Sequence, residues 1–165
     1  MNIALCGMMG SGKTTIAKIL SEKYGLRLID TDAIIVKKHG AISEIFAKNG
    51  EQYFRDLETK VIEEFCSECG NLIIALGGGA ILKEANVKIL KSSGKIVYLR
   101  TKEENLLKRL QNTTDRPLLN GTMSDIISKI LRERSPIYEN AADKIIDTDG
   151  LPPEKIADII AEALL

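Results

Sequence analysis

The stretch that decides the fold of this chain is Gly7-Met8-Met9-Gly10-Ser11-Gly12-Lys13-Thr14-Thr15. It matches the pattern G-x-x-x-x-G-K-[ST] and lies between a short apolar run and a segment with helical periodicity, which is the context that the pattern requires. The glycines allow successive N–H groups to point inward at the start of a helix, where the helix dipole also attracts anions. The stretch therefore predicts a loop that binds the phosphates of a nucleotide.

The same loop predicts which groups hold the phosphates and a metal ion. We expect Lys13 to reach the β and γ phosphates and the Thr14 hydroxyl to hold Mg²⁺. The expected nucleotide contacts in the loop are Gly10, Ser11, Gly12, Lys13, Thr14 and Thr15. A glycine-rich turn that binds nothing is the alternative, but packing gives no reason for Lys13 and Thr14 to follow Gly12 in register.

Length and charge restrict the class of protein. The 165 residues predict one domain, residues 1–165, that is large enough for a full core. The 23 Lys and Arg residues balance the 23 Asp and Glu residues, so charge gives no argument for nucleic acid as a partner. No apolar run approaches the roughly 18 residues of a membrane span, and no signal peptide is recognisable. We therefore expect a cytoplasmic protein that binds neither nucleic acid nor membranes.

The three cysteines do not predict a disulfide framework, because their number is odd and no export signal accompanies them. Cys66 and Cys69 form a single C-x-x-C at the end of a helical stretch. A redox pair usually lies where a strand opens into a helix, and no second pair completes a zinc site. We therefore expect these two cysteines to pack at the end of a helix.

Short apolar segments alternate with segments of helical periodicity along the chain. The predicted strands are 2–6, 26–29, 72–76, 95–99 and 144–147. The predicted helices are 13–24, 32–39, a short helix capped by Ser43, 51–69, 82–92, 102–111, 124–140 and 153–164. Strands separated by helices form βαβ crossovers, which predict a three-layer α/β sandwich with a mainly parallel five-stranded sheet.

Polar or glycine-rich residues follow the first three strands: the phosphate loop, then Asp30-Thr31-Asp32, then Gly77-Gly78-Gly79. Since ligands bind at the carboxyl ends of parallel strands, we expect all of them on one rim. We expect Asp30 beside the water shell of Mg²⁺, and Asp32 to hydrogen-bond an attacking hydroxyl and to take its proton. One of these three residues is also expected to cap the following helix, but capping does not explain two carboxylates.

Five further motifs follow the phosphate loop in order. They are Ile29-Asp30-Thr31-Asp32, Gly50-Glu51-Gln52-Tyr53-Phe54-Arg55-Asp56-Leu57-Glu58, Leu76-Gly77-Gly78-Gly79-Ala80, Arg116-Pro117-Leu118-Leu119 and Arg134-Ser135-Pro136-Ile137-Tyr138. With this set the chain resembles the shikimate kinase family from Ile3 to its C-terminal helix. The resemblance implies a P-loop kinase with a mobile lid, which uses ATP and Mg²⁺ to phosphorylate the 3-hydroxyl of shikimate on the route to chorismate and the aromatic amino acids.

The resemblance also implies how the acceptor is held. It assigns the shikimate carboxylate to Arg55 and Arg134, and a guanidinium fork can bind a carboxylate through two hydrogen bonds. Glu58 follows Arg55 by three residues on one helix and can hold it in a single rotamer. Gly77, Gly78 and Gly79 would let the backbone approach the ring and donate N–H groups to its hydroxyls.

The acceptor-binding helical region is expected at about residues 32–60. Phe46 and Phe54 within it resemble residues that wall the acceptor pocket, although core packing explains Phe46 equally well. Residues 112–123 lack helical periodicity between two helices and predict a lid that excludes water. Within the lid, Arg116 is expected to close over the transferring phosphates.

The sequence gives weaker signals for the residues that bind the base of the nucleotide. Arg109 matches a family position that stacks on adenine, but an ordinary solvated helix face explains it as well. The family places a further adenine-contacting loop at residues 147–152, which carries no sharp motif.

Two other functions stay open at this point. One is another small-molecule kinase, for gluconate or a nucleoside monophosphate, although a monophosphate needs more cationic groups than Arg55 and Arg134 supply. The other is a regulator that binds ATP without transferring its phosphoryl group. The interpretation as a shikimate kinase predicts a monomeric enzyme with Lys13, Asp32 and Arg116 as catalytic residues.

Overall fold

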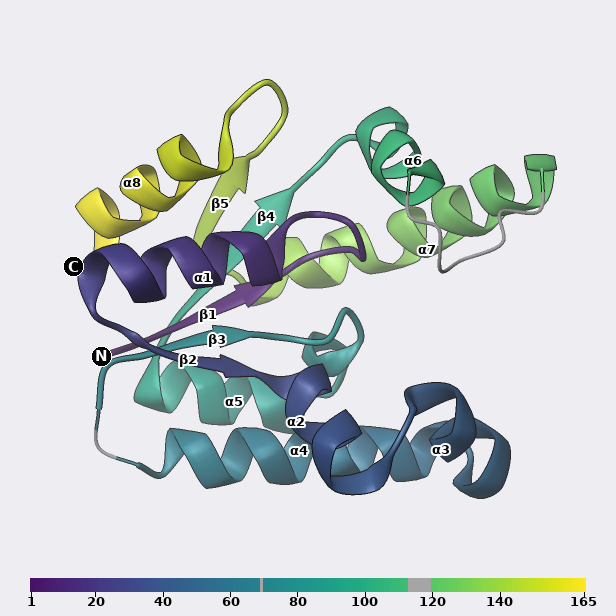
Figure 1. Cartoon of the computed structure of the whole chain (residues 1–165), viewed down its shortest axis with the longest axis horizontal. Coiled ribbons are helices and arrows are strands. Elements are labelled where there is room, and N and C mark those ends of the chain that lie inside the picture. Colours follow the sequence, from purple (N-terminus) through teal and green to yellow (C-terminus); the bar gives the residue numbers. More distant parts are fainter. Residues whose placement is uncertain (69, 113–119) are drawn as a thin grey trace.

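A computed structural model describes residues 1–68, 70–112 and 120–165 (Figure 1). The described strands are β1 (Asn2–Cys6), β2 (Arg27–Asp30), β3 (Leu72–Ala75), β4 (Gly94–Arg100) and β5 (Lys144–Asp147). The described α-helices are α1 (Lys13–Tyr24), α2 (Thr31–His39), α3 (Ile42–Asn49), α4 (Glu51–Cys66), α5 (Glu84–Ser93), α6 (Glu103–Gln111), α7 (Asn120–Ala141) and α8 (Pro153–Leu164). A short 3₁₀ helix, η1 (Ala80–Leu82), precedes α5.

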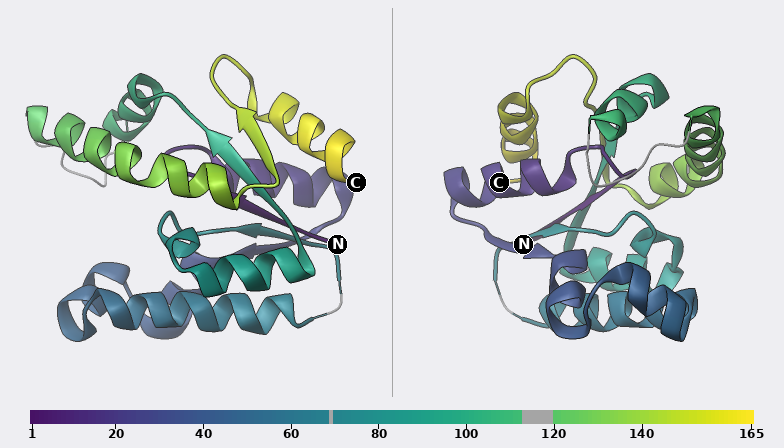
Figure 2. Two further views of the ribbon diagram at one scale, coloured as in Figure 1. Left: turned by 180° about the vertical axis from the view of Figure 1, so that it is seen from behind. Right: turned by 45° about the vertical axis from the view of Figure 1, so that its right-hand side comes forward.

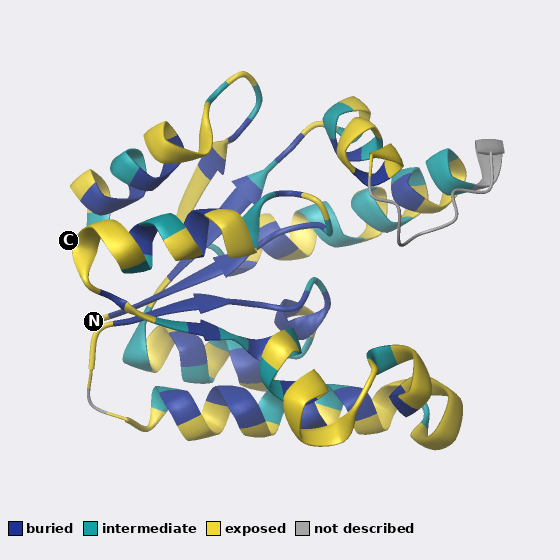
Figure 3. Ribbon diagram, in the orientation of Figure 1, coloured by how far each residue is buried: buried dark blue, intermediate teal, exposed yellow. Residues whose placement is uncertain are grey.

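The strands form one sheet in the order β2-β3-β1-β4-β5, and neighbouring strands pair in parallel throughout. Every residue of β1 and β3 is buried, as the dark blue strands of Figure 3 show. Apolar side chains on both faces of a strand are typical of parallel sheets, because helices cover both faces. The predicted parallel five-stranded sheet is therefore confirmed.

Alternate residues of the central strand β1 face two different helical layers. Ile3 and Leu5 pack with residues of α1 and α8, whereas Ala4 and Cys6 pack with residues of α4, α5 and α7. This alternation follows from strand geometry, in which successive side chains point to opposite faces. Figures 1 and 2 show the sheet between the two layers, so the molecule is the predicted three-layer sandwich.

Some predicted helix ends differ from the structure. The third helix begins at Ile42 after Ala41, so Ser43 lies inside the helix and does not cap it. The helix predicted for 124–140 begins at Asn120, inside the stretch predicted as a lid. Adding one turn to an existing helix requires no new nucleation, so the poor helix formers at its start do not stop it.

Several predictions fall on residues outside the described ranges. The central part of the predicted lid, residues 113–119 with Arg116, is among them, and so is Cys69. The helix predicted for 51–69 ends at Cys66, which is half-buried and has a free thiol. Within the described parts of the chain, no helix is long and apolar enough to cross a membrane.

Candidate active site

The loop between β1 and α1 is shaped by three glycines in conformations that other residues rarely adopt. The φ angles of Gly7, Gly10 and Gly12 are 144°, 81° and 92°. A side chain at Gly7 would also meet the Leu99 carbonyl oxygen at 2.8 Å, so the loop is confined by β4. Ser11 is buried, and its hydroxyl has no hydrogen-bond partner among the described residues. The Ser11 hydroxyl is therefore available to donate a hydrogen bond to an anion in the loop.

Lys13 is the first residue of α1 and folds back over this loop. Its Nζ donates hydrogen bonds to the carbonyl oxygens of Gly7 at 2.8 Å and Met8 at 2.9 Å. Burial lowers the pKa of Lys13 to about 8, although the carboxylates of Asp32 and Asp30 act in the opposite direction. The loop therefore fixes the ammonium group where an anion would enter.

Asp30 connects the phosphate loop to α2. One of its carboxylate oxygens accepts a hydrogen bond from the Ala33 N–H at 3.0 Å and caps the helix, so Asp30 is the residue of Asp30-Thr31-Asp32 that takes the capping role. The other oxygen accepts from the Thr14 hydroxyl at 3.0 Å. A hydroxyl beside a carboxylate is the kind of donor set that Mg²⁺ prefers.

The structure contains no cluster of three or more His, Cys, Asp or Glu side chains suited to a metal ion within its described ranges. Mg²⁺ in nucleotide sites usually takes only one or two protein ligands, with phosphates and water completing the octahedron. The pair formed by Thr14 and Asp30 fits that pattern.

On the other side of the rim, Arg55 is held by acidic residues of its own helix. Its guanidinium donates to Glu58 Oε2 at 2.6 Å and to Glu51 Oε1 at 3.3 Å, and it lies 5.4 Å from the centroid of the Phe54 ring. Glu58 is fully buried, and burial raises its pKa while the positive charge of Arg55 opposes that shift. The predicted pairing of Arg55 with Glu58 is confirmed.

The first glycine after β3 is needed for space. A side chain at Gly77 would meet Glu58 Oε1 at 2.5 Å and Asp32 Oδ1 at 2.6 Å. The Gly77 N–H donates to the Thr31 hydroxyl at 2.9 Å, and this hydroxyl donates in turn to the Ala75 carbonyl at 3.4 Å. The start of α2 and the loop after β3 are therefore joined by hydrogen bonds, and Asp32 is brought to the same rim.

The next two glycines face the two arginines. A side chain at Gly79 would overlap the guanidinium group of Arg55, and a side chain at Gly78 would lie 3.6 Å from Arg134 Nη1. Neither glycine has a positive φ angle, so close approach of Arg55 requires the glycine at position 79, whereas a β-carbon at Gly78 would make only ordinary van der Waals contacts. The structure thus brings Arg55 of α4 and Arg134 of α7 to one loop.

Phe46 and Phe54 pack against each other, with ring centroids 5.1 Å apart. Phe54 is buried in the core, whereas Phe46 is 36% exposed. Phe46 is therefore outside the buried core, and its position at the pocket wall stays a prediction.

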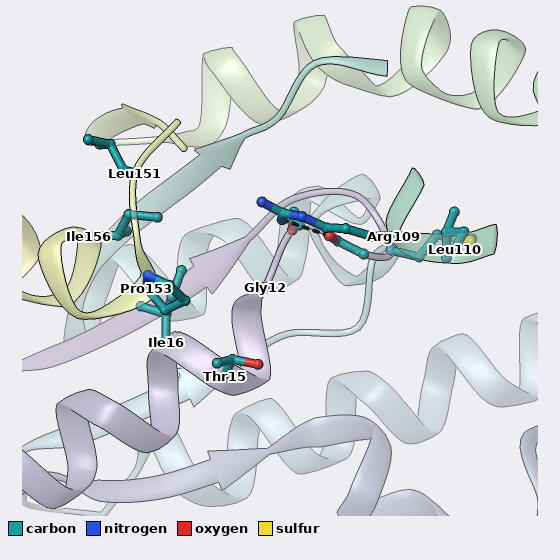
Figure 4. Close-up of a pocket in the computed structure, with 11 residues that line it drawn as sticks. Gly12, Thr15, Ile16, Arg109, Leu110, Leu151, Pro153 and Ile156 are labelled. Carbon is teal, nitrogen blue, oxygen red and sulfur yellow. Dashed lines mark hydrogen bonds between the residues drawn. The ribbon is translucent and has the colours of Figure 1, made fainter. Parts of the chain in front are cut away.

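A cavity of about 650 Å³ adjoins the phosphate loop on the side that faces α6 and α8 (Figure 4). Its lining residues are Met9, Gly10, Ser11, Gly12, Thr15, Ile16, Arg109, Leu110, Leu151, Pro153 and Ile156. Arg109 extends over the loop and donates to the Gly10 carbonyl at 3.0 Å. Leu151, Pro153 and Ile156 form an apolar wall that sequence reasoning did not assign; the only signal was the unspecific loop at 147–152.

A smaller cavity of about 230 Å³ lies along the start of α1 and is lined by Gly10, Gly12, Lys13, Thr14 and Thr15. All the predicted loop contacts therefore line one or both cavities. Asp32, Arg55, Arg134 and the three glycines form a second cluster around the loop 77–79, whereas Arg116 lies outside the described residues.

Comparisons with known proteins agree with this geometry. Residues 9–165 match the family model for shikimate kinase. Shikimate kinases of Dehalococcoides mccartyi and Caldicellulosiruptor bescii are 43% and 47% identical to this chain, over 99% and 96% of it and over 93% and 92% of their own lengths.

Solved structures are similar too. The shikimate kinase of Acinetobacter baumannii in complex with shikimate superposes with a TM-score of 0.89 at 38% identity, covering 98% of this chain and 91% of that chain. The shikimate kinase of Aquifex aeolicus gives a TM-score of 0.82 at 33% identity, with 99% and 95% covered. On the family match and these identities over nearly the whole chain, this chain belongs to the shikimate kinase family.

Proposed function

We propose that this chain transfers the γ-phosphoryl group of ATP to the 3-hydroxyl of shikimate, giving shikimate 3-phosphate and ADP. One observation carries the proposal: two guanidinium groups and the carboxylate of Asp32 lie around the loop 77–79. This loop is next to the phosphate loop. An acceptor with one carboxylate and several hydroxyls matches these groups. Membership of the shikimate kinase family supports the same reaction.

In this proposal Arg55 and Arg134 bind the shikimate carboxylate. Guanidinium groups bind carboxylates through paired, charge-assisted hydrogen bonds, which fix orientation as well as affinity. Glu58 and Glu51 hold Arg55 from behind, so little side-chain entropy is lost when the substrate binds. The N–H groups of Gly78 and Gly79 are proposed to donate to the ring hydroxyls, whereas the expected contact of the Gly77 N–H is wrong because that group donates to the Thr31 hydroxyl.

Asp32 is the proposed partner of the reacting hydroxyl. Its carboxylate lies against Gly77 on the acceptor side and acts electrostatically on Lys13 on the nucleotide side. It orients the 3-hydroxyl and accepts its proton as the oxygen attacks the γ phosphorus. The bond between the γ phosphorus and the bridging oxygen breaks in the same displacement, and ADP leaves.

On the nucleotide side, Lys13 and the N–H groups of residues 10–15 bind the phosphates, and we propose that Arg116 closes over them. The adenine ring is proposed to occupy the larger cavity between Arg109 and the apolar wall of Leu151, Pro153 and Ile156. A guanidinium plane on one side and apolar carbon on the other suit a flat aromatic ring.

Thr14 would hold Mg²⁺ directly, and Asp30 would hold it through water. When bound, the ion neutralises negative charge on the phosphates. We further propose that residues 1–165 work as a single domain and a monomer in the cytoplasm, with no nucleic acid or membrane partner.

The test is release of ADP with MgATP and, in separate reactions, shikimate, quinate, gluconate, AMP or no acceptor. We expect turnover with shikimate far above every other reaction. Turnover with AMP or gluconate instead would assign the chain to another kinase class, and ATP binding without any turnover would support the regulator.

A further inference from the structure

Tyr138 joins three parts of the site but has no role in the steps proposed above. Its side chain is fully buried in α7, and its ring packs on that of Tyr98 with centroids 5.0 Å apart. Its hydroxyl donates a hydrogen bond to the Gly78 carbonyl oxygen at 2.6 Å. A buried ring pair needs no hydroxyl at this position, so the polar contact requires a separate explanation.

The hydroxyl of Tyr138 also meets the guanidinium of Arg134. These residues are four apart on α7, which places them on one face of the helix. Burial raises the pKa of the Tyr138 hydroxyl, and Arg134 acts on this group to oppose the rise, first by its positive charge and then by hydrogen bonding. Since a guanidinium can only donate, the hydroxyl is the accepting group. A β-carbon at Gly78 would lie 3.6 Å from Arg134 Nη1 and 3.8 Å from the Tyr138 hydroxyl. The Tyr138 hydroxyl thus lies between the guanidinium of Arg134 and the Gly78 carbonyl oxygen, to which it donates.

The third contact of Tyr138 is with the phosphate loop. The Met8 sulfur lies 4.0 Å from the Tyr138 hydroxyl, and the Gly7 carbonyl oxygen would lie 3.7 Å from a β-carbon at Gly78. Gly78 is therefore packed between α7 and the loop that binds phosphates. A hydroxyl that fixes Gly78 also sets its distance from that loop.

We propose that Tyr138 is a positioning residue for the acceptor: its hydroxyl orients Arg134 toward the shikimate carboxylate and fixes the Gly78 carbonyl relative to the phosphate loop. The inference rests on the proposed function, because it assigns the acceptor side to shikimate. Burial raises the pKa of Tyr138 to about 12, so its hydroxyl keeps the proton that it donates at neutral pH.

Tyr98 offers a matched control. Its ring belongs to the same pair and is 1% exposed, but its hydroxyl interacts with Ser135, away from the loop 77–79. Tyr138→Phe and Tyr98→Phe therefore each remove one hydroxyl and leave both rings. A purely structural role predicts similar effects for both variants, whereas a positioning role predicts an effect of Tyr138→Phe alone on the acceptor.

The experiment measures kcat and KM for both substrates in the two variants, with thermal unfolding as a check of folding. Tyr138→Phe should raise the KM for shikimate about tenfold and change the KM for ATP by less than about twofold, as expected for loss of a hydrogen bond to a charged group. Tyr98→Phe should change neither KM by more than about twofold. An unchanged KM for shikimate in Tyr138→Phe, or equal changes in both variants, would overturn the inference.

Hydrogen exchange of the backbone amides of residues 76–81 gives a readout that needs no substrate. These amides should exchange faster in Tyr138→Phe than in wild type and Tyr98→Phe, and equal exchange would overturn the positioning role. If Tyr138→Phe does not fold, Arg134→Gln removes the donor to the hydroxyl and should speed the same exchange. Wild type that neither binds nor phosphorylates shikimate would refute the proposed function, while the exchange experiment would still decide the role of Tyr138.

Discussion

Carbonyl groups of the phosphate loop hold Lys13 in place. Lys13 is proposed to bind the nucleotide phosphates in this loop. Lys13→Ala should therefore leave the fold intact and lower kcat by at least about a hundredfold, because a preorganised positive charge at the transferring phosphate is lost. Steady-state kinetics measures kcat, and thermal unfolding shows whether the fold is intact. Lys18→Ala, at an exposed position of the same helix, is the control and should keep full activity. Retained turnover in Lys13→Ala would remove the proposed role.

Glu58 is a buried carboxylate with one oxygen bonded to Arg55 and the other without a hydrogen-bond partner among the described residues. Glu58→Gln keeps the shape but removes the charge that holds Arg55, so the KM for shikimate should rise about tenfold while the KM for ATP stays nearly constant. Glu63→Gln, at an exposed position of α4, should change neither value. An unchanged KM for shikimate in Glu58→Gln would mean that Glu51 alone positions Arg55.

The same substitution has a predictable pH dependence of stability. Burial raises the pKa of Glu58 in the folded protein, so above the ordinary Glu pKa of about 4.3 the folded state holds a proton that the unfolded state has lost. Wild-type stability from this group is complete below that pH and falls as the pH rises. The free energy of unfolding of Glu58→Gln, measured by urea titration relative to wild type, should therefore increase from pH 4 to pH 8. A constant difference would contradict the raised pKa.

Several site residues could be predicted from the sequence because their spacing is set by local geometry. The glycines, Lys13 and Thr14 occur at the fixed spacing of one strand-to-helix loop. The capping role of Asp30 could not be separated from its neighbours, because it depends on the backbone angles of the residue rather than on its type. The sequence also does not predict that Gly77 and Gly79 are needed for space, since the side chains that lie against them come from other elements.

At the scale of single elements, helix α6 links the phosphate loop to the larger cavity. Its Leu106 and Leu110 would lie within 4 Å of a side chain at Gly10, and its Arg109 lines the cavity. Arg109→Ala should raise the KM for ATP about threefold to tenfold and leave the KM for shikimate nearly constant, because it removes one face of the adenine site. Lys108→Ala tests the alternative of a solvated helix face and should change nothing. A larger effect on shikimate would contradict the assignment.

Periodicity predicted the elements well and their ends less well. Serine is common at helix caps, so the sequence predicts a cap at Ser43, but the carbonyl of Ala41 accepts from the Ile45 N–H and starts the helix earlier. The start of α7 was missed because its first residues have low helix propensity, and the longer helix that follows decides their conformation. In both cases the neighbouring backbone decided the outcome.

At the scale of the whole molecule, the strand order β2-β3-β1-β4-β5 follows from contacts between residues far apart in the chain. Alternating strands and helices predicted a parallel sheet, but they do not say which strands are neighbours. The contact between Tyr138 and Gly78 spans 60 residues and has no local signature. The proposed acceptor site depends on such contacts, so residue spacing along the chain alone does not predict it.

The nucleotide should stabilise the whole molecule, because its cavity is lined by the phosphate loop, α6 and α8. With MgADP at about 100 times its Kd, the midpoint of thermal unfolding should rise by about 5–10 °C, which corresponds to about 2.7 kcal/mol in a domain of this size. Removing Mg²⁺ with a chelator should reduce this shift, and Thr14→Val should make the shift insensitive to the chelator. Equal shifts with and without Mg²⁺ in wild type would refute the proposed metal site at Thr14 and Asp30, while leaving the base and phosphate contacts in place.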